Sequence, residues 1–73
     1  MSEFSFDVQE NLGVVSKSDT GWQKEIKLIS WNGRPVKYDI REWSPDQKKM
    51  SRGITFTEQE MITLKGLLNK MEL

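Results

Sequence analysis

The 73-residue chain contains no cysteine and no histidine, and these two absences exclude several classes of protein. Without cysteine there are no disulfides, and without either residue the usual zinc ligands are missing. The same absences remove the best nucleophile and the commonest general base, so we expect no catalysis, no metal and no cofactor. The five glycines form neither GxGxxG nor GxxxxGK, two common phosphate-binding loops.

Long apolar segments are absent as well. No run approaches the roughly 20 residues that a membrane-spanning helix needs, and the opening Met-Ser-Glu-Phe lacks the basic start of a signal peptide. We therefore expect a soluble, cytoplasmic protein that forms a single domain over residues 1–73. A chain of this size buries only about 60% of its unfolded surface, so we expect it to gain further core by forming a homodimer.

The net charge is zero, but the charges are unevenly distributed. Residues 1–16 carry three acids and no base. Residues 17–52 carry nine bases against five acids, an excess of four positive charges. Residues 53–73 carry three acids and two bases. Because a local field attracts a charged ligand more than the total charge does, the middle of the chain is a candidate surface for an anionic partner.

The centre of the chain predicts a β-hairpin. Asn32 and Gly33 separate two alternating segments, and both residues tolerate the positive φ that a tight hairpin turn needs. We expect strands over residues 22–31 and 36–43. Pro45 ends the second strand, because proline cannot donate a hydrogen bond to a sheet.

Two further strands and a helix complete the predicted order. Residues 4–16 alternate as one strand or two short ones, with a bend or bulge at Gly13. Residues 53–56 form a short fourth strand with Ile54 and Phe56 inward.

The helix starts at a capping box made by Thr57 and Glu60. Its apolar stripe is Met61, Leu64, Leu67, Leu68 and Met71. We expect the stripe to cover the sheet and to contact the second copy through Leu64, Leu67, Leu68 and Met71.

Alternation sorts the two arms of the hairpin into two faces. Val36, Tyr38 and Ile40 share one face with Ile26 and Leu28, and we expect this apolar face to be the core. The opposite face carries Lys27, Ile29, Trp31, Lys37, Asp39, Arg41 and Trp43. We expect this second face to be exposed to water.

An exposed face with indoles and cations has the composition of a surface for single-stranded nucleic acid, where cations follow the backbone and rings stack bases. The residues leave alternatives open. Trp31 and Trp43 are equally consistent with core positions, and the face of Trp22 is undetermined. The basic segment 48–52 is either a solvated loop or a flap over phosphates.

Several segments resemble one family. They are Tyr38-Asp39-Ile40-Arg41-Glu42-Trp43, Pro45-Asp46, Met50-Ser51-Arg52-Gly53-Ile54-Thr55-Phe56 and the capped helix. These segments are similar to the transcriptional coactivator family called positive cofactor four. Gly21-Trp22-Gln23-Lys24 and Ser30-Trp31-Asn32 are similar to its bacterial YdbC-type branch. The likeness covers about residues 21–70.

The resemblance implies an α+β fold in which a four-stranded antiparallel curved sheet is followed by one C-terminal helix. It implies that two copies pair through their helices and sheets. It also implies that curved sheet channels bind single-stranded or melted DNA with little sequence preference.

The resemblance also implies roles for individual residues. Trp31 matches the aromatic that stacks bases just before the hairpin turn, and Trp43 matches the aromatic at the end of the next strand. Arg41 matches an arginine that meets the DNA backbone. Lys24 and Arg52 match basic positions early in the second strand and before the fourth.

The chain departs from the coactivator pattern at two positions, where Trp22 replaces a cation and Ile29 replaces an arginine. The long Ser- and Lys-rich extension of the coactivators is absent.

We expect a homodimeric single-stranded-DNA-binding protein of low sequence specificity. Its expected role is in transcription regulation, replication or repair, with the transcription machinery as a further partner. The alternatives are a protein-interaction module that uses the aromatic face, and RNA binding. The expected nucleic-acid contacts are Trp22, Lys24, Lys27, Trp31, Arg34, Lys37, Arg41, Trp43, Lys49 and Arg52.

Overall fold

The computed structural model describes residues 5–73, and its elements follow the predicted order of four strands and one helix. The strands are β1 (Phe6–Lys17), β2 (Gln23–Trp31), β3 (Lys37–Trp43) and β4 (Ile54–Phe56), and the helix is α1 (Glu58–Lys70). The strands form one antiparallel sheet in the order β1-β2-β3-β4. The predicted α+β class is thus confirmed, while Phe4, expected in the first strand, lies outside the described residues.

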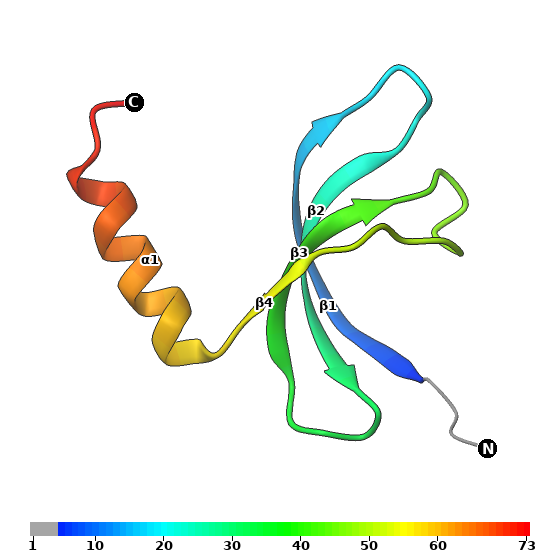
Figure 1. Ribbon diagram of the computed structural model, residues 1–73, viewed down its shortest axis with the longest axis horizontal. Coiled ribbons are helices and arrows are strands. Elements are labelled where there is room, and N and C mark those ends of the chain that lie inside the picture. Colours follow the sequence, from blue (N-terminus) through cyan, green and yellow to red (C-terminus); the bar gives the residue numbers. More distant parts are fainter. Residues whose placement is uncertain (1–4) are drawn as a thin grey trace.

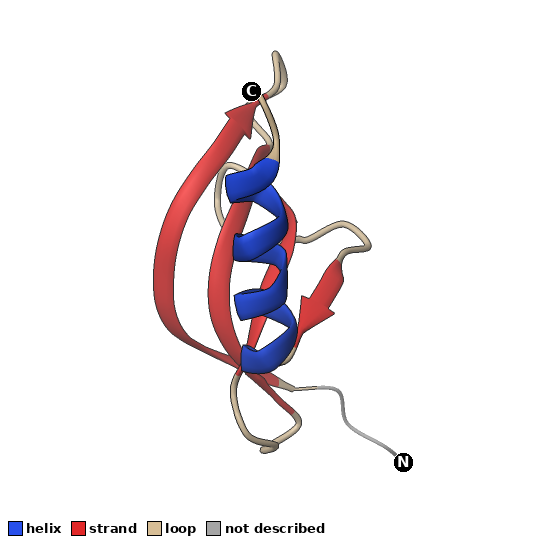
Figure 2. Ribbon diagram, turned by 90° about the vertical axis from the view of Figure 1, so that its left-hand side faces the viewer, coloured by secondary structure: helices blue, strands red, loops and turns tan. Residues whose placement is uncertain are grey.

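The sheet is strongly bent, so that one of its faces is concave (Figures 1 and 2). The pairing of β1 with β2 is interrupted by register shifts at three places: between Val8 and Glu10, between Asn11 and Gly13, and between Val14 and Ser16. Each extra residue bends a strand and increases its twist. The irregularity predicted at Gly13 is therefore one of three, and β1 is a single bent strand.

The turn between β2 and β3 has the predicted hairpin chemistry. Asn32 and Gly33 have φ values of 51° and 76°, as a turn with two left-handed residues requires. The Arg34 N–H closes the turn by donating to the Trp31 carbonyl at 2.9 Å. The Asn32 side chain also ties the turn to the start of β1, because its Oδ1 accepts from the Ser5 N–H at 2.9 Å.

The register of β2 against β3 confirms the predicted sorting into two faces, since Lys27 pairs with Asp39 across the strands. The burial of the two faces, however, is the reverse of the prediction. The face that carries Lys27 and Asp39 is the concave one, and it was expected to be exposed to water. It nevertheless contains the buried apolar residues Ile29 and Trp43, which are 0% and 1% exposed. The bend causes this reversal, because it folds the sheet around its own polar and aromatic face.

The opposite face, predicted to be the core, is only half covered in this chain. Its half-buried apolar residues are Ile26, Leu28, Tyr38, Ile40 and Phe56. Ile54, predicted to point inward, is 55% exposed. Val36 lies before the start of β3 and is exposed as well. The prediction of a sealed core on this face is therefore wrong for the single chain.

The helix leaves this face open because it touches the sheet mainly near its own start. Figure 1 shows α1 running away from β4, and none of its residues is buried. Its predicted capping box is confirmed: the Thr57 N–H donates to Glu60 Oε1 at 2.8 Å, and the Glu60 N–H donates to Thr57 Oγ1 at 3.1 Å. Within residues 5–73, no helix is both long and apolar enough to cross a bilayer.

Candidate functional site

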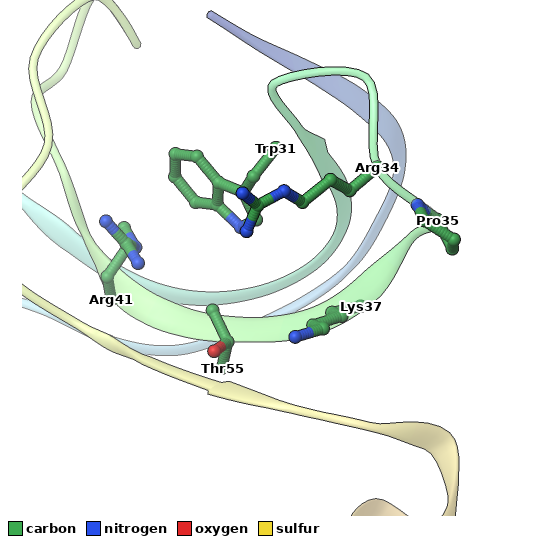
Figure 3. A pocket seen from close by; sticks show the side chains of 6 residues that line it. All are labelled: Trp31, Arg34, Pro35, Lys37, Arg41 and Thr55. Carbon is green, nitrogen blue, oxygen red and sulfur yellow. The ribbon is translucent and has the colours of Figure 1, made fainter. Parts of the chain in front are cut away.

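A cavity on the concave face is surrounded by one indole and three cationic side chains (Figure 3). It has a volume of about 340 Å³ and is lined by Trp31, Arg34, Pro35, Lys37, Arg41 and Thr55. The lining comes from the end of β2, the hairpin turn, β3 and β4. The bend therefore gathers four of the predicted contact residues around one opening.

The indole of Trp31 is half-buried at this cavity and is held from two directions. The Arg41 guanidinium lies 4.6 Å from the centre of its ring. The ring of Phe6, from the start of β1, lies 5.6 Å away and is tilted by 43°. A cation over an aromatic face and a tilted ring pair are both attractive arrangements. The orientation of Trp31 is thus set by its neighbours before any ligand arrives.

Trp43, in contrast, is sealed inside the bend. Its ring lies 5.8 Å from the ring of Phe6, and the Lys27 ammonium sits 4.7 Å from its centre. With 1% of its surface exposed, the indole has no face open to a base in this conformation. The expectation that Trp43 lies on an exposed surface is wrong, because the curvature of β1 brings Phe6 across it.

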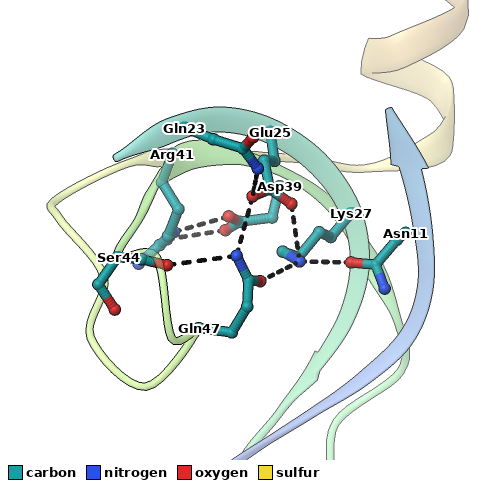
Figure 4. Close-up of polar contacts among 8 residues, drawn as sticks. All are labelled: Asn11, Gln23, Glu25, Lys27, Asp39, Arg41, Ser44 and Gln47. Atoms are coloured by element: carbon teal, nitrogen blue, oxygen red, sulfur yellow. Dashed lines mark hydrogen bonds and ion pairs between the residues drawn. The ribbon is translucent and has the colours of Figure 1, made fainter. Parts of the chain in front are cut away.

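Lys27 was also expected on the exposed face, and it is only 3% exposed. Its ammonium forms an ion pair with Glu25 Oε1 at 3.0 Å. It donates further hydrogen bonds to Gln47 Oε1 at 3.0 Å and to Asn11 Oδ1 (Figure 4). An ammonium has three donors, and all three have protein acceptors here. The expected exposure of Lys27 is therefore wrong, and its charge is already matched within the protein.

Gln47 fastens the loop between β3 and β4 to the concave face. Its backbone has a φ of 64°, a left-handed conformation that is uncommon for a residue other than glycine. Its side-chain amide accepts from Lys27 and donates to Glu25 Oε2 at 3.0 Å. The hydrogen bonds offset the cost of the strained backbone and tie the loop to β2. Lys48 and Lys49 follow Gln47 in this loop and are exposed.

The pKa of Glu25 reflects the same contacts. Burial by itself raises this pKa, but hydrogen bonds from Gln23, Lys27 and Gln47, with the charge of Lys27, hold the net pKa below the usual 4.5. Because the folded pKa is below the unfolded one, the carboxylate stabilises the fold above about pH 4.5. That contribution is lost as the pH falls through the folded pKa.

We therefore expect the midpoint of urea unfolding to fall as the pH drops below about 4.5. Glu25→Gln should show a shallower fall over the same range, because it lacks the titrating group. Glu72→Gln, in the segment after the helix, is the control and should follow the wild type. Identical pH profiles for Glu25→Gln and the wild type would contradict this role of Glu25.

The remaining predicted residues do not line this cavity. Lys24 alternates with Glu25 along β2 and pairs with Glu42, so it projects from the face opposite the cavity. Trp22 is half-buried just before β2, so it belongs to neither face of a strand. Lys24 and Arg52 line a second hollow beside Arg41. Lys49 is exposed in the loop. Within residues 5–73, no three acidic side chains gather as a metal site requires.

The sequence did not identify the residues outside the central hairpin that shape the concave face. Phe6 was predicted only as part of a strand, and its contacts with two indoles depend on the bend of the sheet. Asn11 and Gln47 meet at Lys27, although they are far from each other in the sequence. In the sequence, only the bend or bulge predicted at Gly13 indicated that β1 is bent; the other register shifts are visible only in the structure.

The chain matches known proteins over most of its length. The family model described as Transcriptional Coactivator p15 (PC4) matches residues 18–67. The chain is also 54% identical over 71 residues to an uncharacterized protein from Treponema pallidum (strain Nichols), covering 97% of this chain and 84% of that protein. The family match contains β2, β3, β4 and every residue that lines the cavity.

Proposed function

Because the chain belongs to the Transcriptional Coactivator p15 (PC4) family, we propose that it is a homodimeric single-stranded-DNA-binding protein of low sequence specificity. The observation that supports this most is the cavity on the concave face, where the half-buried indole of Trp31 lies among three cationic side chains. Single strands are bound by this combination of rings that stack bases and cations that follow the phosphates.

In this proposal the strand runs through the concave face near the hairpin turn. A base stacks at Trp31, and the exposed Arg34 and Lys37 contact phosphates on either side. Lys49 and Arg52 extend the positive surface, and Trp22 lies beside it. Lys24 projects from the opposite face of β2 and adds positive charge beside Arg52, outside the concave face. Trp43 and Lys27 are buried inside the bend, where they hold the shape of the concave face. Duplex DNA binds poorly, because its paired bases are stacked on one another and cannot reach the ring.

The proposed dimer follows from the apolar surface that one chain leaves bare. The helix has no buried residue, and Leu67, Leu68 and Met71 are each roughly half exposed. The half-covered face of the sheet lies behind it. Large apolar side chains exposed together on one element are typical of an association site. We propose that a second copy covers it through Leu64, Leu67, Leu68 and Met71.

The cellular setting completes the proposal. The protein acts without catalysis, in the cytoplasm, in transcription regulation, replication or repair. The transcription machinery is its further partner. The coactivator description of the family supports a place in transcription.

Titration with labelled oligo-dT should show saturable binding by anisotropy, together with quenching of tryptophan emission. If about four phosphates are neutralised per groove, the slope of log affinity against log salt should be roughly −3. Trp31→Ala should weaken binding by about 1–3 kcal/mol, the value of one base stack. Lys70→Ala, at the end of the helix, is the control and should bind as the wild type does.

Matched duplex and RNA competitors define the specificity. An unlabelled duplex should compete much less well than the same single strand. The proposal fails if the wild type shows no binding to oligo-dT at low salt, or if duplex competes as well as single strand. Equal affinity for matched RNA and DNA strands would remove the preference for DNA.

A further inference from the structure

The buried carboxylate of Asp39 holds the Arg41 side chain. Asp39 is 0% exposed, and its two oxygens accept from Arg41 Nε at 2.6 Å and from Arg41 Nη2 at 2.7 Å. Such a two-point pair fixes the plane of a guanidinium as well as its position. An isolated buried carboxylate is costly. Arg41 is therefore not free to leave Asp39 for another anion.

Gly53, in the segment that leads into β4, restricts the Arg41 side chain further. A Cβ at Gly53 would lie 2.8 Å from Arg41 Nε and 2.6 Å from the Ile40 carbonyl. Backbone thus packs directly against the guanidinium stem, at a position where only glycine fits. With Asp39 on one side and Gly53 on the other, the guanidinium has one defined position, 4.6 Å from the centre of the Trp31 ring.

The other two cations of the cavity are in a different situation. Arg34 and Lys37 are both exposed. Among residues 5–73, neither forms an ion pair, whereas Arg41 pairs with Asp39. The Arg41–Asp39 pair carries no net charge, so it attracts a phosphate less than either free cation does. The three cations that surround the cavity therefore divide into one that is neutralised and two that are not.

We infer that Arg41 is a positioning residue, which Asp39 holds in place so that its guanidinium orients Trp31 for base stacking, and that Arg34 and Lys37 are the phosphate ligands of the cavity. The inference rests on the proposed function and assigns the roles within that same site. It differs from the role that the family resemblance implies for Arg41, which is a contact with the DNA backbone.

The test is the salt dependence of oligo-dT binding. Each phosphate contact on a single strand contributes about 0.7 to the slope of log affinity against log salt. Arg34→Gln and Lys37→Gln should each make the slope shallower by about 0.7. Arg41→Gln and Arg41→Lys should weaken binding to a similar extent, up to the roughly 5- to 150-fold value of one stack, while the slope stays that of the wild type.

Arg41→Lys is the decisive variant, because it keeps the charge but loses the planar fork. If Arg41 binds phosphate, Arg41→Gln will make the slope shallower and Arg41→Lys will restore it, and the inference is overturned. Wild-type affinity in Arg41→Gln would also overturn it. Failure of the proposed function gives a different result, because the wild type itself would then not bind.

Folding and spectroscopy provide independent readouts. If Arg41→Gln leaves Asp39 unpaired and the chain does not fold, the double variant Asp39→Asn/Arg41→Gln removes both charges and should also keep the wild-type slope. In the free protein, Arg41→Gln and Arg41→Lys should change tryptophan emission, whereas Lys37→Gln should not. The change should disappear in a Trp31→Phe background. Its persistence there would contradict the contact with Trp31.

Discussion

Trp43→Ala should lower the free energy of unfolding by about 3–5 kcal/mol, the range for truncating a large buried aromatic side chain. Trp43 is 1% exposed and packs against Phe6 and the Lys27 ammonium. Its removal leaves a cavity inside the bend and exposes the ion pair between Lys27 and Glu25. For a chain of this size such a loss is a large part of the total stability, so we expect partial or complete unfolding at 25 °C.

Urea denaturation followed by circular dichroism measures this effect, and Trp31→Ala is the matched control. Trp31 is half-buried at a cavity, so its removal should cost less stability than that of Trp43 and should act mainly on DNA binding. We thus expect Trp43→Ala to act mainly on stability and Trp31→Ala to act mainly on DNA binding. A Trp43→Ala protein that is as stable as the wild type but fails to bind oligo-dT would restore Trp43 as a contact residue.

Leu68→Glu should convert the proposed dimer into a monomer. Leu68 is 46% exposed on α1 in the single chain, in the stripe that we propose as the interface. A carboxylate placed in an apolar interface without a partner costs several kcal/mol, which weakens the dimer at least about a hundredfold. Sedimentation velocity at micromolar concentration should show one species of dimer mass for the wild type and one of monomer mass for the variant.

Gly66→Ala is the control for this experiment. Gly66 is two residues from Leu68, about 200° around the helix, and nothing lies within 4 Å of the position its Cβ would occupy. The substitution should leave the dimer intact and stabilise the helix by about 1 kcal/mol. A monomeric wild type, or a Leu68→Glu protein that remains dimeric, would contradict the proposed interface.

Local chemistry made parts of the fold predictable from the sequence. Asn32 and Gly33 specify their turn because few residues accept positive φ, and Thr57 with Glu60 specifies the start of the helix through two reciprocal hydrogen bonds. The two faces of the hairpin were predictable for the same reason, since alternation is a property of a single strand. Each of these features is determined by residues that are close in sequence.

The assignment of burial was wrong because it depends on the shape of the whole sheet. Alternation shows that Trp43 and Lys27 share a face, but it does not show that the sheet closes around that face. Composition also misled the prediction, since a face with six charged or aromatic residues indicates exposure to water. The charges of Lys27, Asp39 and Arg41 are instead matched inside the bend. Gln47, a partner of Lys27, is brought near only by the three-dimensional structure.

The two edge strands of the sheet have a consequence for aggregation. β1 and β4 are the two outer strands of the sheet. β1 is interrupted at three places, and β4 is only three residues long. Neither presents the long, flat row of unpaired amides on which another chain can build an intermolecular sheet. We therefore expect little edge-to-edge aggregation, and in the proposed dimer association uses the apolar surface of α1 and the sheet instead of a strand edge.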